Sequence, residues 1–217
     1  MKLTSSEALD LINKEQDKKQ GNERWINHSI CVGNTASVIA KALNLDEDFA
    51  KTLGYIHDIG KRFDYKEDGV FPHAIKGYEY IKSLGYDEEY AGICIKHSFL
   101  NNDIDCISND RDETDKQNPN YDFVKEYIKE EYSIYEKIIN LCDLMCTIKV
   151  LTVDKRMMDL LLRHGVFAKT HYHIKETIKL KEYFDNLLGY NLFQNILSSN
   201  NLNNLNKSFV ILLINCH

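Results

Sequence analysis

The sequence predicts an all-α protein, and three observations support this prediction. Apolar residues recur at spacings of three and four along most of the chain, sustained alternation of apolar and polar residues is absent, and only two residues are proline. Spacings of three and four place apolar side chains on one face of a helix, whereas alternation of apolar and polar residues would indicate a half-buried strand. Proline interrupts helix interiors, so its scarcity also favours helices.

The chain is long enough for one ordinary domain with a real core. It has 217 residues, of which 43% are hydrophobic and 28% are charged, as is typical of globular proteins. We expect a single helical domain over residues 1–198, followed by a C-terminal tail at 199–217. The tail begins with an asparagine-rich run, SSNNLNNLNK, and continues with the apolar run FVILLI. The apolar run is compatible with a packed terminal helix, with a strand or with a sequence oddity.

Helices in the first third of the chain follow from the apolar spacing and from breaks between periodic segments. The first is expected from Ser5 or Ser6 to about Lys14, and the second follows Asn22, after a break at Gly21 and the polar run before it. The third is expected to begin near Asp46 and to end at Ile59–Gly60, where glycine would occupy a favoured C-terminal position. One stripe of the second helix carries Trp25, His28, Val32, Ala36 and Ile39.

The rest of the chain continues the same pattern around one polar segment. Pro72 suits the first turn of a helix that runs from His73 to about Leu84 and stops at Gly85. Residues 101–120 are polar, acidic and aperiodic, so they are expected to form a surface loop, either a lid over a cleft or a solvated segment. The other helices are expected at 87–100, 121–131, 133–150, 154–164, 170–187 and 190–198.

Charge and termini limit the classes of partner and the compartment. The formal net charge of -6 argues against broad binding to nucleic acid or to anionic membranes. The N-terminal MKLTSSEALD has no apolar signal core, and no apolar stretch approaches the roughly 20 residues that span a bilayer. We therefore expect a cytoplasmic protein without membrane contact, whose six scattered cysteines stay reduced. Cys142 and Cys146 lie one turn apart, which fits buried core thiols better than a soft-metal site.

Histidine and aspartate residues on apolar helical segments carry the chemical signal. His57 and Asp58 are adjacent in GYIHDIGK, although such a pair alone could be a core histidine beside a solvated carboxylate. His28 and His97 taken singly would also be core histidines. Asp143 lies within the apolar INLCDLMC, where a carboxylate is costly to bury without a partner or a cation. A metal centre would supply one partner for all of these groups.

Imidazole and carboxylate ligands indicate one or two divalent metal ions. Iron or manganese suits this ligand chemistry, and magnesium, zinc, nickel or cobalt also fits. The candidates outnumber the ligands of one tetrahedral site, so two ions that share a carboxylate are expected. Such pairs are typical of phosphatases and related hydrolases. The predicted ligands are His28, His57, Asp58, His73, His97 and Asp143.

The order of these residues resembles the HD superfamily of metal-dependent phosphohydrolases. His28, the pair His57–Asp58 and Asp143 match its pattern, and HDIG at 57–60 resembles the HDIG variant. His73 and His97 resemble the two-metal branch, which includes the HD-type bacterial symmetrical diadenosine tetraphosphate hydrolases. The resemblance covers about residues 22–150 and implies an HD-domain helical bundle.

The resemblance also implies roles for individual residues. His28, His57, Asp58 and Asp143 would hold the first metal, and Asp58 would bridge to a second held by His73 and His97. A hydroxide between the metals would attack phosphorus. Asp58 and Lys61 are the expected catalytic residues.

Basic residues near the predicted ligands could hold the substrate. Arg24, Lys61 and Arg62 are candidates for gripping phosphate oxygens, with a solvated surface position as the alternative. Asp64 and His164 are weaker candidates. His171 and His173 could bind metal if they lay on a strand.

The expected function is hydrolysis of a small phosphorylated substrate. A nucleotide, a dinucleoside polyphosphate or another phosphate ester would fit, nucleic acid is not expected as a partner, and a homo-oligomer remains open. The ligands alone also suit a di-iron oxygenase of the myo-inositol oxygenase-like type, although HDIG followed by Lys61–Arg62 looks more like the hydrolases. The complete ligand set disfavours a non-catalytic nucleotide-sensing module.

Overall fold

The computed structural model describes residues 1–63, 70–107 and 113–198. The DYKEDG segment at 64–69, which contains the candidate Asp64, and the predicted tail at 199–217 lie outside the described residues. So does part of the predicted loop at 101–120.

The all-α prediction is confirmed within these ranges. They contain no strand, and the only extended pairing in them is an isolated bridge between Cys146 and Val150. The helices are α1 (Ser5–Asn13), α2 (Asn22–Ala42), α3 (Glu47–Ile56), η1 (Ile59–Arg62), α4 (Pro72–Ser83), α5 (Glu88–Ala91), α6 (Ile93–Lys96), η2 (Leu100–Asn102), α7 (Glu113–Lys116), α8 (Pro119–Tyr127), α9 (Ile134–Met145), α10 (Val153–His164), α11 (Thr170–Leu188) and α12 (Leu192–Ser198).

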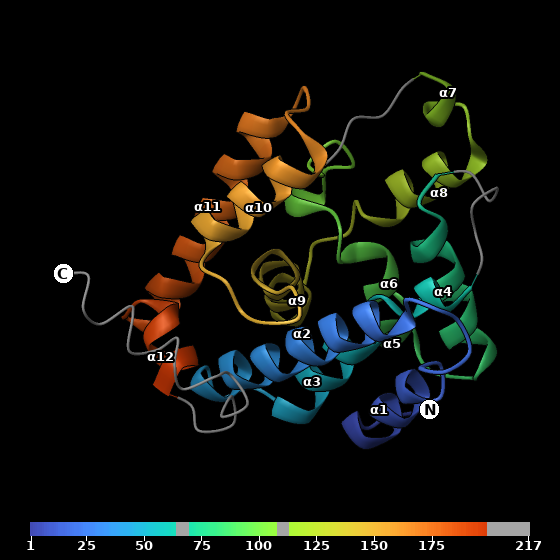
Figure 1. Ribbon diagram of the computed structural model, residues 1–217, viewed down its shortest axis with the longest axis horizontal. Helices are drawn as coiled ribbons and strands as arrows, with labels where there is room; N and C mark the ends of the chain where they lie inside the picture. The colour runs from blue at the N-terminus through green and yellow to red at the C-terminus, as the bar shows by residue number, and fades with distance from the viewer. Residues whose placement is uncertain (64–69, 108–112, 199–217) are drawn as a thin grey trace.

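Helix α9 occupies the middle of the molecule. In Figure 1 it is seen nearly end-on, with α2 crossing near it, α10 and α11 on one side and α6 on the other. A capping box starts α9, because the Ser133 hydroxyl accepts from the Glu136 amide and the Glu136 carboxylate accepts from the Ser133 amide. This central helix carries Asp143 to the point where the other elements converge.

Helices α2 and α3 pack closely enough to bring their backbones into contact. A Cβ atom at Gly54 would lie 2.4 Å from the Gly33 Cα atom, so neither helix tolerates a side chain at this crossing. Asp46 caps α3 by accepting from the Phe49 amide. The close crossing holds His28 of α2 beside His57 at the end of α3.

Apolar side chains form two separate clusters. The first joins α1, α2, α3, α9, α10, α11 and α12 with residues of α4, α5 and α6, and its largest members include Ile39, Leu53 and Phe184. The second joins the start of α4, the segment around α6 and η2, and α8, with Phe99 and Tyr121 among its members. The candidate metal ligands come from elements of both clusters.

Several predicted boundaries are confirmed and others are wrong. α1, α4, α10 and α11 begin and end close to their predicted residues, and α2 begins at Asn22, close to its predicted start. α3 ends at Ile56, before the predicted Ile59–Gly60, and the chain then turns into η1. Gly60 is therefore not a helix C-cap. It lies inside η1, where a Cβ atom would meet the His73 carbonyl oxygen at 1.8 Å.

Three further predictions need correction. The helix expected at 87–100 is divided at Gly92 into α5 and α6, and α9 stops at Met145, not at residue 150. The segment 101–120 is not simply a surface loop. Ile104 and Ile107 in it are buried in the second cluster, Cys106 is also buried, and the segment contains α7 and the start of α8.

None of the helices in the described ranges combines the length and the apolar character that a membrane crossing requires.

Candidate metal centre and cleft

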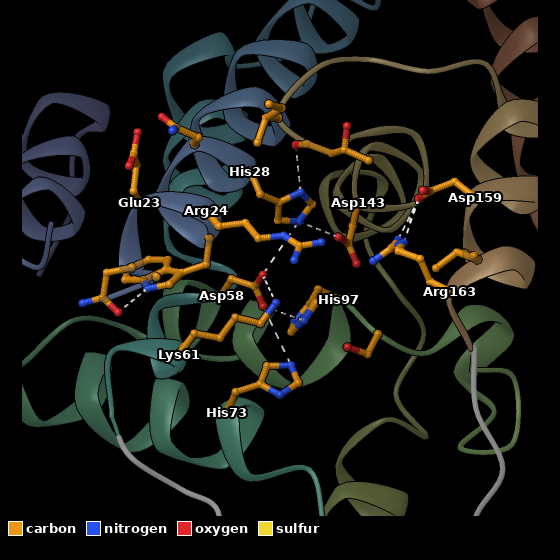
Figure 2. A pocket seen from close by; sticks show the side chains of 18 of the residues that line it. Glu23, Arg24, His28, Asp58, Lys61, His73, His97, Asp143, Asp159 and Arg163 are labelled. Atoms are coloured by element: carbon orange, nitrogen blue, oxygen red, sulfur yellow. Dashed lines mark hydrogen bonds and ion pairs between the residues drawn. The ribbon is translucent and has the colours of Figure 1, made fainter. Parts of the chain in front are cut away.

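Five elements bring the six predicted ligands to one place. His28 comes from α2, His57 and Asp58 follow α3, and His73 lies in the first turn of α4. His97 follows α6, and Asp143 lies near the end of α9. Figure 2 shows the labelled side chains of this set pointing toward a common centre beneath Arg24.

The first group joins His28, His57, Asp58 and Asp143. The Nε2 atoms of His28 and His57 are 3.3 Å apart, and the Asp58 Oδ2 atom lies 3.7 Å from the first and 3.5 Å from the second. Asp143 Oδ1 is 2.9 Å from His28 Nε2 and 3.8 Å from His57 Nε2. Four potential ligand atoms thus surround one small volume.

The second group shares Asp58 with the first. Its other carboxylate oxygen, Oδ1, lies 3.6 Å from His97 Nε2 and 3.8 Å from His73 Nε2. Three ligand atoms of the second group, from Asp58, His73 and His97, lie within 4.8 Å of one another, as do those of His28, His57 and Asp58 in the first group. A single carboxylate therefore stands between two pairs of imidazoles.

Backbone carbonyls orient three of the imidazoles. His57 Nδ1 is 2.7 Å from the Gly54 carbonyl oxygen, His97 Nδ1 is 3.1 Å from that of Ile93, and His28 Nδ1 is 3.2 Å from that of Thr147. A proton on Nδ1 satisfies each carbonyl and leaves Nε2 free to accept. Metal-binding histidines are oriented by such partners, so the set is held in a ligating form.

Asp58 tests whether the residues fit a metal ion. Its side chain is almost completely buried, yet Oδ1 has no hydrogen-bond partner within the described parts of the chain. The separations of 3.5–3.8 Å around Asp58 exceed hydrogen-bond lengths. They suit ligands that each lie about 2.1 Å from a shared cation. The donor set of imidazoles and carboxylates therefore fits one or two divalent ions.

The charges of the site favour the ligating protonation states. Burial alone would raise the pKa of Asp58, but Lys61 and the neighbouring imidazoles outweigh it and hold that pKa well below its usual range. Burial lowers the pKa of His73 to about 3 and that of His97 to about 4. These three groups are therefore a carboxylate and two neutral imidazoles at neutral pH, which are the forms that bind metal.

His28 and Asp143 form a charged pair in the metal-free protein. Burial disfavours the His28 imidazolium, but the hydrogen bond to Asp143 and its charge raise the pKa of His28 above the ordinary value. The pKa of Asp143 is correspondingly low, because that bond outweighs its own burial. The proton on His28 Nε2 thus stands where a cation would otherwise neutralise the carboxylate.

A large cleft opens over the ligand groups. It has a volume of about 1060 Å³, and its lining includes His28, Asp58, His73, His97 and Asp143. Lys61 also lines it and contacts the Asp58 Oδ2 atom with its ammonium group. Arg24 is exposed at its edge, makes no ion pair with any described residue, and extends toward the ligand cluster in Figure 2.

Arg62 does not belong to this cleft, which corrects its prediction as a substrate-binding residue. Its guanidinium pairs with Glu15 at 2.9 Å and stacks over the Tyr80 ring at 4.0 Å. These contacts tie η1 to the chain after α1 and to α4. Lys61 and Arg62 are neighbours in sequence, but their side chains point in different directions, because successive residues of a helical turn point to different sides.

The weaker histidine candidates occupy other positions. His164 is exposed and lines the cleft. His171 and His173 lie on α11, not on a strand, and neither belongs to the ligand groups found among the described residues. His173 is buried with its ring 6.0 Å from that of Phe167, while His171 is exposed.

Helix α10 also contributes two arginines to the cleft that the sequence did not single out. Arg156 and Arg163 line it, and both donate to Asp159, at 2.6 and 2.7 Å. Figure 2 shows Arg163 and Asp159 across the cleft from Arg24. Their spacing of three and four residues indicates a common helix face. That spacing was readable in the sequence, but nothing in it showed which face would meet the cleft.

Comparison with known proteins identifies the family of the central region. The sequence profile described as HD domain matches residues 25–147. Ribonuclease Y of Clostridium botulinum (strain Hall) is 36% identical over 76 residues, which are 35% of this chain and 14% of the relative. Ribonuclease Y of Protochlamydia amoebophila is 29% identical over 128 residues, 57% of this chain and 24% of the relative.

The matched segments cover only a minor part of these relatives. Ribonuclease Y of Clostridium tetani gives a similar result, with 36% identity over 77 residues that make up 14% of its length. The chain therefore spans a quarter or less of the curated relatives named here. No solved structure gives a significant match.

Proposed function

Because the chain belongs to the HD-domain family, we propose that it is a metal-dependent phosphohydrolase acting on a small phosphorylated substrate, with a nucleotide as the expected class. One observation carries the proposal. The buried Asp58 carboxylate lies between two pairs of imidazoles, and one of its oxygens has no hydrogen-bond partner in the described ranges. Lys61 contacts only the Oδ2 atom, so a cation beside Oδ1 would satisfy the carboxylate oxygen that is buried without a partner in these ranges.

We further propose that two ions bind, as the resemblance to the diadenosine tetraphosphate hydrolase branch implies. His28, His57, Asp58 and Asp143 would hold the first ion, and Asp58, His73 and His97 the second. Iron or manganese is the expected metal, since the set lacks thiolates. When bound, a pair of divalent ions activates water at neutral pH and offsets charge on phosphate oxygens.

Side chains of this protein would supply the remaining interactions. Arg24 stands at the cleft edge without an ion-pair partner among the described residues, so it can form charge-assisted hydrogen bonds with phosphate oxygens. Lys61 holds Asp58 in place and faces the same cleft, where its ammonium can also meet substrate oxygens. Asp58 and Lys61 are thus the proposed catalytic residues.

The net charge of the chain supports a small substrate. The whole chain carries a formal charge of -6, although basic residues such as Arg24 and Lys61 line the cleft beside Glu23 and Asp159. A long nucleic acid would be repelled by this net charge, whereas a small phosphate would meet mainly the basic residues of the cleft. The curated relatives are named ribonucleases, so a short RNA oligonucleotide belongs among the test substrates even though long nucleic acid is disfavoured.

Metal analysis followed by a substrate panel tests the proposal. The gently purified protein is analysed for bound metals and then incubated, with the metals found, with nucleotides, dinucleoside polyphosphates, phosphate monoesters and a short RNA. We expect metal-dependent phosphate release or bond cleavage from at least one, and its loss in Asp58→Asn. Inactivity toward the whole panel, or substrate-dependent oxygen uptake by an iron-loaded sample, would count against hydrolysis.

A further inference from the structure

A smaller inner chamber borders the ligand groups. It has a volume of about 230 Å³ and shares His73, His97 and Asp143 with the large cleft. Ser98 also lines both cavities, so the two meet at the ligand cluster. A substrate with its phosphate at the cluster can therefore direct one part into the chamber and another into the cleft.

Apolar side chains form much of the chamber wall. Phe71 and Phe99 meet edge to face with centroids 5.1 Å apart, and Leu100, Ile107 and Leu144 complete this wall. An apolar cavity of about 150 Å³ can hold a benzene ring. The inner chamber thus has room for a one- or two-ring heterocycle, and its walls suit flat apolar ring faces.

Asn140 lines this chamber and carries one unsatisfied acceptor, Oδ1. Its amide nitrogen donates to the Lys96 carbonyl oxygen at 3.1 Å and to that of Glu136 at 2.9 Å. These two bonds fix the amide, so Oδ1 cannot exchange places with the nitrogen without losing both. Asn140 is 2% exposed, and Oδ1 has no hydrogen-bond partner among the residues that the structure describes.

His173 adds a second polar group to the lining. It is 3% exposed, and its ring makes no hydrogen bond with any residue in the described ranges. Burial, only partly offset by Asp143, lowers the pKa of His173 to about 4, so the ring is neutral at pH 7. A neutral imidazole offers one donor and one acceptor.

We propose that the inner chamber is a nucleobase subsite, in which Asn140 Oδ1 accepts a hydrogen bond from a ring or amino N–H group of the base. The inference rests on the proposed function, because it places the scissile phosphate at the shared ligand cluster. A sugar ring fits less well, since its many hydroxyl groups would face the wall formed by Phe71, Phe99 and Ile107 without partners. A base presents apolar faces to that wall and polar edges to Asn140 and His173.

Nucleoside binding tests the chamber without requiring catalysis. The metal-loaded protein is titrated by calorimetry with adenosine, guanosine, cytidine and uridine, and with ribose as the base-free control. We expect at least one nucleoside to bind and ribose not to bind. Asn140→Leu should weaken the binding about tenfold, because the N–H group of the base would then be buried without an acceptor.

A second pair of variants covers the case in which Asn140→Leu fails to fold. Ile107→Phe adds volume inside the chamber, whereas Ile104→Phe adds the same volume to a neighbouring buried residue that does not line it. We expect Ile107→Phe to lower the kcat/KM for a nucleotide relative to that for ribose 5-phosphate about tenfold. Ile104→Phe should leave this ratio as in the wild type.

The outcomes separate this inference from the proposed function. If nucleotides and ribose 5-phosphate are hydrolysed equally well and no nucleoside binds, the chamber holds water only and the inference is overturned. If nucleosides bind through Asn140 but no phosphate compound is cleaved, the subsite stands and hydrolysis fails. An unchanged ratio in Ile107→Phe would also overturn the subsite.

Discussion

At the scale of single residues, Asp58 differs from the other candidate ligands because each of its oxygens faces a different pair of imidazoles. Oδ2 lies near His28 and His57, and Oδ1 near His73 and His97. Asp143 contacts only the first pair. The two carboxylates should therefore have different effects on metal content.

This difference predicts the metal content of three variants. Asp58→Asn should lose both ions, Asp143→Asn should lose mainly the first, and His73→Ala mainly the second. Elemental analysis of each purified variant gives the number of ions per chain. Asp10→Asn, on α1 outside the cleft lining, serves as the matched control. Equal losses in Asp143→Asn and His73→Ala would show that the ions do not divide as proposed.

The buried imidazoles predict how the metal-free protein responds to pH. His97 and His73 have folded pKa values of about 4 and about 3, below the roughly 6.5 of an unfolded histidine. The unfolded state binds more protons below pH 6.5, so the free energy of unfolding should fall as the pH drops from about 6.5 to about 4. His28 has the opposite effect on the free energy of unfolding, because its pKa is raised in the folded protein. Protonated His28 stabilises the fold below pH 6.5, and this stabilisation is lost as the pH rises through the folded pKa of His28.

Urea unfolding of chelator-treated protein between pH 7 and pH 4 measures this dependence. His97→Gln removes one of the two destabilising protonations and should flatten the curve. An unfolding free energy that stays constant over the range in the wild type, or a slope that His97→Gln leaves unchanged, would contradict the burial of neutral imidazoles.

At the scale of elements, Gly60 explains how the first turn of α4 reaches the cluster. A Cβ atom at residue 60 would lie 1.8 Å from the His73 carbonyl oxygen and 2.7 Å from the Gly77 nitrogen. Both are backbone atoms of α4, so the helix as a whole would have to move away from η1. The glycine that ends HDIG thus permits α4 to bring His73 within reach of Asp58.

Gly60→Ala should therefore destabilise the protein and loosen the second metal site. Overpacking against backbone costs about 2 kcal/mol or more, and displacement of α4 moves His73 away from Asp58. Urea unfolding gives the loss of stability, and elemental analysis the loss of an ion. Gly92→Ala is the control, because its nearest obstacle is the hydroxyl at the end of the Tyr127 side chain. Equal effects of the two substitutions would refute the close packing of α4 on Gly60.

At the scale of the whole molecule, the two ligand groups belong to different hydrophobic clusters. His57 and Asp143 adjoin Ile56 and Cys142 of the first cluster, whereas His73 and His97 lie beside Ala74 and Phe99 of the second. Asp58 stands between them. Ions bound to both groups would therefore connect the two clusters through one carboxylate.

Metal ions should consequently make unfolding more cooperative. Trp25 is the only tryptophan and lies in the first cluster, so its fluorescence reports on that cluster, while far-UV circular dichroism reports on all helices. With metal bound, the two urea transitions should coincide, and the midpoint should rise as ligand binding stabilises the folded state. After chelation, circular dichroism should change before Trp25 fluorescence. Coincident transitions in both states would show that the clusters are coupled without metal.

Much of the fold and the ligand set could be predicted from sequence because both depend on local patterns. Apolar spacing predicts helices, and their ends are marked by local features: the capping hydroxyl of Ser133, the restricted φ of Pro72 and the positive φ of Gly85. Histidine and aspartate on apolar segments indicate a shared partner. The structure places all six predicted ligands together, while their binding of metal stays a prediction.

The amino-acid sequence alone therefore predicts the all-α class, most helix positions and the residues that converge on one centre. Tertiary packing alone decided that Arg62 faces Glu15 and Tyr80, that Gly60 receives the backbone of α4, and that α10 and Asn140 line cavities beside the cluster. The physical reason is that side-chain direction and cavity shape depend on contacts between segments far apart in the chain. Periodicity identifies the apolar face of a helix, but not the neighbour that will cover it.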